Sequence, residues 1–135
     1  MRIAFDLHGV ITLEPEHYKK HMSLLCKIND TIVFVISGPQ AINVEKELNE
    51  LGFYRGTHFH HIGSVIDYLI SKGNIPTIDE YGNYWFEEKI WWESKSLICR
   101  ELKIDILEDD HQEYGSYFIN GHPTKFILKH HAYNS

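Results

Sequence analysis

Apolar runs of strand length alternate with segments of helical periodicity along most of the chain. The β-branched run at 31–36 is the clearest strand, because an unbroken apolar stretch suits a parallel strand covered on both faces. Further strands are predicted at 2–6, at 105–110 and within 56–63, and helices at 16–28, 39–52, 64–73 and 91–104. This alternation predicts an α/β fold, a three-layer Rossmann-like parallel sheet with helices on both faces.

Turn and cap residues mark where several of these elements begin. Pro39 is expected to open the second helix from an early helical position. Ser64 is the N-cap candidate of the third helix, with Asp67 in its first turn. The segment at 113–131 predicts one or two closing strands with an Asn-Gly turn.

Residues 74–92 break the alternation. They are rich in proline, glycine, tyrosine and tryptophan, and we expect a small irregular aromatic insert within a single domain that spans 1–135. The stretch "YGNYWFEEKIWW" concentrates its aromatic rings. The rings could hide apolar surface at the edge of the sheet, or they could form a pocket wall that stacks on a base or a sugar.

Composition serves mainly to exclude classes of protein and function. The formal net charge of −6 argues against nonspecific binding of nucleic acid, which needs a basic face. No run approaches the ~20 apolar residues of a membrane span, and the first residues lack the apolar core of a signal peptide. We therefore expect a soluble, cytoplasmic protein with no membrane partner. Cys26 and Cys99 are expected to be buried free thiols.

Residues able to do chemistry stand at the ends of the predicted strands. Asp6 ends the first strand, Ser37 follows the second, and Asp109 and Asp110 close the strand at 105–110. If these strands are parallel, their carboxyl ends meet at one edge of the sheet, where ligands bind in such folds. Lys95, fourteen residues before Asp109, could reach the same edge. Carboxylates, an ammonium group and a hydroxyl together suit a divalent cation and a phosphate.

At these points the chain resembles the haloacid dehalogenase-like (HAD) superfamily. The stretches "FDLHGVIT" and "FVISG", then Lys95, then "DILEDD" follow one another in the order of that family's four motifs. The resemblance implies that Asp6 is the nucleophile and that Lys95 stabilises the nucleophile and the intermediate. It implies that Ser37, with Gly38, binds the phosphoryl group. It also implies a magnesium site made of Asp6, Asp109, Asp110 and the backbone carbonyl of His8.

The function implied is hydrolysis of a phosphomonoester through an aspartyl-phosphate. The short segments between motifs leave no room for a large cap domain, so the chain looks like a capless or minimally capped member. The expected substrate is a phosphorylated small molecule or a nucleic-acid end. The lysine motif is the least specific, since Lys89 and Lys103 are also near. The alternative function is a catalytically silent metal- or phosphate-binding domain that acts through a partner protein.

His8 departs from the family's pattern, which usually has a second aspartate two residues after the nucleophile. His8 could take over the acid/base role of that aspartate, because histidine exchanges protons near neutral pH. It could instead mark a different reaction or a slow phosphatase, or a domain that has lost catalysis and only binds. The sequence leaves these three interpretations open.

Other histidines are spaced closely enough to raise the question of a zinc site. His17 and His21 are four residues apart on a predicted helix, and His58, His60 and His61 form a second cluster. A structural zinc site usually needs four closely spaced ligands. We therefore expect these histidines to serve packing or to lie on the surface.

Overall fold

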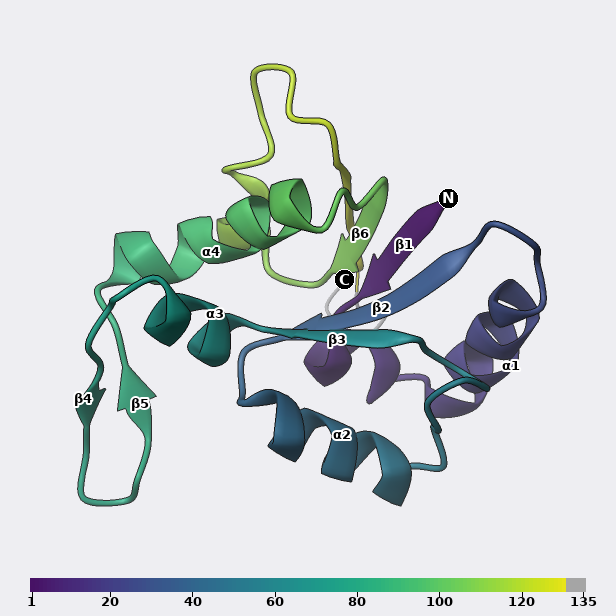
Figure 1. Cartoon of the computed structure of the whole chain (residues 1–135), viewed down its shortest axis with the longest axis horizontal. Helices are drawn as coiled ribbons and strands as arrows, with labels where there is room; N and C mark the ends of the chain where they lie inside the picture. Colours follow the sequence, from purple (N-terminus) through teal and green to yellow (C-terminus); the bar gives the residue numbers. More distant parts are fainter. Residues whose placement is uncertain (131–135) are drawn as a thin grey trace.

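A five-stranded sheet forms the centre of the computed structural model, which describes residues 1–130. The strands run in the order β3, β2, β1, β6, β7, and every pairing in this sheet is parallel (Figure 1). Their bounds are β1 Arg2–Phe5, β2 Ile32–Ser37, β3 His61–Ser64, β6 Ile106–Asp109 and β7 Lys125–Leu128. The predicted α/β class with a parallel sheet is confirmed. The last five residues of the predicted single domain, 131–135, lie outside the described residues.

Helices connect the strands and flank the sheet. They are α1 Pro15–Cys26, α2 Ala41–Glu50, α3 Val65–Ser71, α4 Glu88–Glu101 and α5 Gln112–Gly115, with a short kinked turn, η1, at Leu7–Ile11. The N-cap prediction for α3 is confirmed, because the Ser64 side chain accepts a hydrogen bond from the Asp67 backbone N–H at 3.0 Å. The prediction that Pro39 opens α2 is wrong by two residues. Gln40 is the N-cap, so Pro39 only fixes the approach to the helix.

Two clusters of buried side chains form the core. Phe5, Val33 and Val35 pack with side chains of α1 and α2. Ala4 and Phe34, next to these in β1 and β2, pack instead with side chains of α3 and α4. Because neighbouring residues of a strand point to opposite faces, the alternation explains why β2 is apolar at every position before Ser37.

The aromatic insert is more regular than its composition suggests. Within 74–92, β4 Thr77–Ile78 and β5 Tyr84–Trp85 pair antiparallel as a hairpin, which projects away from the main sheet (Figure 1). The insert also ends earlier than expected, because Glu88 already belongs to α4. The strands are only two residues long, too short for a periodic pattern to reveal them.

The closing segment holds one described strand, and it is not part of a hairpin. The Asn-Gly pair at 120–121 does turn the chain, with positive φ at both residues. The segment before it folds as α5 and turns, however, and β7 pairs parallel with β6. The predicted Asn-Gly turn therefore lies in a crossover connection. His131, the last residue of the predicted closing segment, lies outside the described residues.

Two further expectations concern the state of the cysteines and the absence of a membrane-spanning helix. Both cysteines are free; Cys99 is buried, whereas Cys26 is only partly so. Within residues 1–130, no helix is long and apolar enough to cross a membrane.

Candidate active site at the carboxyl edge of the sheet

The carboxyl ends of β1, β2 and β6 bring together the residues that the sequence places there. Asp6 continues the ladder beyond β1, because its backbone N–H donates to the carbonyl of Glu108 at 2.9 Å. Ser37 ends β2 and Asp109 ends β6. All three strands are parallel, so these side chains emerge at the same edge. Asp6, Ser37 and Asp109 are each at most 5% exposed, so their polar atoms need partners inside the protein.

Lys95 joins two of these strand ends. Its Nζ donates to Asp6 Oδ1 at 3.1 Å and to Asp109 Oδ2 at 2.5 Å. The side chain is 1% exposed and comes from the second turn of α4. Its Nζ also lies 4.3 Å from the centre of the Tyr114 ring, a cation–π contact. Of the three lysines near the motif, Lys95 is therefore the one in contact with the carboxylates.

Burial and charge act in opposite directions on this ion-pair cluster. Burial raises the pKa of Asp6 to about 6; Lys95 opposes the rise, while Asp109 adds to it. Burial alone would lower the pKa of Lys95, but the charges of Asp6 and Asp109 outweigh it, and the pKa of the ammonium group is raised. Lys95 therefore stays charged at neutral pH, and two buried carboxylates share its charge.

The η1 turn passes directly against Asp110. Gly9 has φ of +85°, a conformation that glycine adopts without strain. A Cβ added at Gly9 would overlap Oδ2 of Asp110. The turn is held in place by a hydrogen bond from the Gly9 N–H to Thr12 Oγ1 at 3.0 Å. The glycine in the first motif is thus required both by its backbone angle and by the space that the carboxylate occupies.

His8 points its ring toward α2. Nε2 of the imidazole lies 2.9 Å from each carboxylate oxygen of Glu47, and the side chain is half exposed. A carboxylate on one ring nitrogen fixes the orientation of an imidazole, as in catalytic dyads. No local pattern predicts this contact, because 39 residues separate Glu47 from His8.

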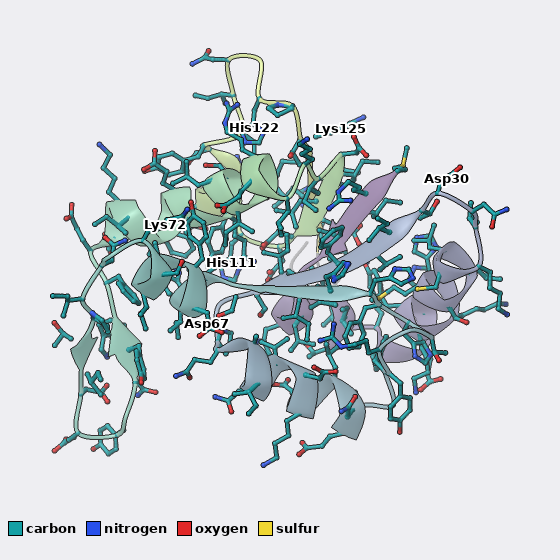
Figure 2. The ribbon with its side chains drawn as sticks, in the orientation of Figure 1. Asp30, Asp67, Lys72, His111, His122 and Lys125 are labelled. Atoms are coloured by element: carbon teal, nitrogen blue, oxygen red, sulfur yellow. The ribbon has the colours of Figure 1, made fainter. Side chains whose placement is uncertain are left out.

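His111, a residue that the sequence reasoning missed, also belongs to the site. It lies two residues beyond the end of β6 and is labelled in Figure 2. Its backbone N–H donates to Asp109 Oδ1 at 3.0 Å, and its Nδ1 lies 3.0 Å from Asp110 Oδ1. The ring stacks on Trp92 at 5.9 Å between centres. A signal existed, because His111 follows the two acids immediately in the sequence.

A cavity of about 270 Å³ opens at this edge of the sheet. It is lined by Asp6, His8, Ser37, Gly38, Pro39, Trp91, Trp92, Lys95, His111 and Tyr114. The predicted phosphate-binding residues Ser37 and Gly38 therefore share one cavity with the predicted nucleophile. Gly38 leaves room for the neighbouring indole, since a Cβ there would lie 3.1 Å from the Trp91 ring. Trp91 and Trp92 belong to the aromatic stretch that could form a pocket wall, and they do line this cavity, whereas Tyr114 is a lining residue that the sequence did not assign to the site.

The donor atoms suit a hard divalent cation. One ligand atom from each of Asp6, Asp109, Asp110 and His111 can be chosen so that all four lie within 4.8 Å of one another. Three of these groups are carboxylates, and oxygen is the donor that Mg²⁺ and Ca²⁺ prefer. The histidine clusters at His17 and at His58 take no part in such a group among residues 1–130.

Those other histidines have packing and hydrogen-bonding roles. His17 and His21 stack on each other at 5.9 Å between ring centres. His58 Nδ1 accepts from the backbone N–H of Tyr54, and His60 Nδ1 from that of Val33, both at 3.0 Å. These contacts agree with the expectation that the histidines serve packing.

Comparisons with known proteins return no match to a family model, a curated protein or a solved structure. The resemblance to the HAD superfamily thus rests on the four sequence motifs. What the site does has to be argued from its own chemistry.

Proposed function

We propose that this chain is a HAD-like, magnesium-dependent phosphomonoester hydrolase with a three-layer, Rossmann-like fold. The observation that carries the proposal is the buried cluster of Asp6, Lys95 and Asp109 beside a cavity that also contains Ser37. Burying two carboxylates costs free energy, and such arrangements concentrate at functional sites. The two core clusters on alternate residues of β1 and β2 support the three layers. The two free thiols support a cytoplasmic location.

The proposed reaction has two steps. The phosphoryl group enters the cavity, where the Ser37 hydroxyl and the Gly38 N–H bind its oxygens. A carboxylate oxygen of Asp6 attacks phosphorus, the bond to the leaving oxygen breaks, and His8 gives that oxygen a proton. Water then attacks the aspartyl-phosphate, His8 takes a proton from the water, and phosphate and the free carboxylate of Asp6 are released.

Lys95 and the divalent cation would assist this reaction by neutralising negative charge. Lys95 neutralises the negative charge that gathers on Asp6 and on the phosphoryl oxygens. Asp6, Asp109, Asp110 and the backbone carbonyl of His8 would hold Mg²⁺, with His111 as a neighbour able to join the set. When bound, Mg²⁺ would neutralise charge on the phosphoryl group.

Hydrolysis of p-nitrophenyl phosphate tests the proposal. We expect the purified protein to release nitrophenol in the presence of Mg²⁺ and to lose that activity in excess chelator, because the carboxylate cluster would lose its counter-charge. Thermal unfolding in the same buffers shows whether the chelated protein is still folded. Activity that is equal with and without chelator would contradict the metal-dependent mechanism.

A catalytically silent binding domain remains the second candidate, because the site contains His8 where phosphatases of the family usually have aspartate. The same experiment separates the two. If Mg²⁺ raises the melting temperature but a panel of phosphomonoesters is not hydrolysed, the binding function stands and the hydrolase is excluded.

The proton role of His8 predicts a dependence on the leaving group. Nitrophenolate leaves without help, whereas the alkoxide of ribose 5-phosphate needs a proton. His8→Gln should therefore lower kcat/KM for ribose 5-phosphate by about 100-fold or more and that for p-nitrophenyl phosphate far less. The ratio kcat/KM is the right quantity, because it reports only the steps up to transfer of the phosphoryl group.

His111→Gln is the matched control, since its imidazole is about as exposed and also contacts a carboxylate. We expect similar losses for both substrates in this variant. If the leaving-group effect follows His111 instead of His8, the acid/base assignment is wrong and the rest of the site is unaffected.

A further inference from the structure

A second cavity adjoins the first and is almost wholly aromatic. It measures about 260 Å³ and is lined by Tyr84, Trp85, Phe86, Glu88, Trp91 and Trp92. Five of these six residues carry aromatic rings, and Phe86 stacks on Trp91 at 6.0 Å between centres. The hairpin projects away from the sheet (Figure 1), but Phe86 and Trp91 pack against the core cluster of α3 and α4. Burial of apolar surface therefore accounts for these two rings and leaves the exposed ring of Trp85 unexplained.

The Trp85 ring is exposed but held in a fixed orientation. The side chain is 59% exposed, yet its Nε1 donates to Asp79 Oδ2 at 2.9 Å. Asp79 also accepts from the backbone N–H groups of Tyr81 and Asn83, both at 2.9 Å, so the turn of the hairpin and the indole share one anchor. An aromatic face held in this way loses little conformational freedom when a ligand stacks on it.

The two cavities share Trp91 and Trp92, so these side chains form the wall between them. Each cavity is smaller than the site of a typical drug-sized ligand, and the pair suits the two ends of one molecule. The lining residues set its direction. The first cavity offers a phosphate the Ser37 hydroxyl, the Gly38 N–H and the ammonium of Lys95, whose charge is shared with Asp6 and Asp109. The second contains the carboxylate of Glu88, which repels a phosphate.

We infer that the aromatic cavity is a leaving-group subsite for the nucleobase of a nucleoside monophosphate, an inference that rests on the proposed phosphatase function. A base offers two flat faces, and stacking on aromatic side chains binds any base. Glu88 adds an acceptor for an amino group or ring N–H on the base edge. The substrate lies with its base against Trp85 and its phosphate beside Asp6, and the sugar passes the wall of Trp91 and Trp92.

The comparison of adenosine 5′-monophosphate with ribose 5-phosphate tests this subsite. The two substrates present the same phosphate, but only the first has a base. We expect kcat/KM to be about 10-fold higher for the nucleotide, the size of one stacking contact. Trp85→Ala should remove most of this preference and Trp85→Phe should restore part of it. Tyr81→Ala is the control, because Tyr81 is an 81% exposed aromatic on the same hairpin that does not line the cavity.

Binding without turnover provides an independent measurement. The chain has three tryptophans, so indole N–H signals in a ¹⁵N spectrum of the protein can be assigned by single substitutions such as Trp85→Phe. Adenosine, which has no phosphate, should shift the Trp85 signal and should do so equally in Asp6→Asn.

The outcomes separate the subsite from the phosphatase. If both substrates are hydrolysed equally well, or if Trp85→Ala behaves like Tyr81→Ala, the subsite is wrong and the phosphatase stands. If adenosine shifts the Trp85 signal but no phosphomonoester is hydrolysed, the phosphatase is wrong and the base subsite stands. A Trp85-dependent preference for choline phosphate over the nucleotide would overturn the nucleobase in favour of a quaternary ammonium group.

Discussion

Asp6→Asn is expected to abolish hydrolysis of p-nitrophenyl phosphate and, in chelator, to make the protein more stable than the wild type. The amide cannot form the aspartyl-phosphate, so kcat/KM should fall at least about 1,000-fold. The free energy of unfolding should rise, in contrast, because burial raises the pKa of Asp6 to about 6. The stability that the protonated carboxyl group contributes is present below the ordinary pKa of 3.8 and is lost as pH rises through about 6. Asparagine stays neutral and avoids this loss.

The gain should be on the order of 2 kcal/mol at about pH 7.5 and should shrink toward zero near pH 4, where the wild-type carboxyl group is also neutral. Urea unfolding at the two pH values measures it. Asp105→Asn is the matched control, because Asp105 is an exposed aspartate beside the opposite end of β6. A variant that is less stable than the wild type at pH 7.5 would mean that the ion pair with Lys95 outweighs the burial of Asp6.

Lys95→Met is expected to be strongly destabilising. The substitution keeps the length of the side chain but leaves Asp6 and Asp109 buried without their shared cation. Breaking a buried pair in this way costs about 3–5 kcal/mol. We expect the urea midpoint to fall accordingly at neutral pH, and to recover partly in acid, where the carboxylates take up protons.

The double variant Lys95→Met with Asp6→Asn sharpens this test, because it removes one of the two uncompensated charges. It should be more stable than Lys95→Met alone, which gives a coupling free energy between the two positions. Lys89→Met is the control on the exposed first turn of α4. If Lys95→Met loses no more stability than Lys89→Met, the ion-pair cluster does not stabilise the fold.

The sheet could be predicted from the chain because its strands carry their own pattern. The apolar, mostly β-branched run of β2 is long enough to identify, and Ser64 marks the start of α3 with its side chain. The β4–β5 hairpin could not be found in this way. It depends on the hydrogen bonds that Asp79 accepts across its turn rather than on the apolar period of its strands. The Asn-Gly pair at 120–121 likewise fixes a turn but not which strands it joins.

The same distinction applies to the candidate site. Asp6, Ser37 and Asp109 stand at strand ends, so parallel pairing alone brings them to one edge. The contact of Glu47 with His8 depends on how α2 packs, and no local pattern encodes it. The aromatic stretch could be proposed as a pocket wall from its composition, but that Trp91 and Trp92 line this cavity depends on how the first turns of α4 pack.

Gly9 and His8 are neighbours in the η1 turn, but they differ in what limits their replacement. Any side chain at Gly9 meets a positive φ and the carboxylate of Asp110 at once. His8 is half exposed, so the fold itself sets few limits on that side chain. Among homologues, Gly9 would be retained wherever the fold is retained, whether or not the protein is an enzyme. Only the histidine would record a change of chemistry, which makes position 8 the one to follow among relatives of this chain.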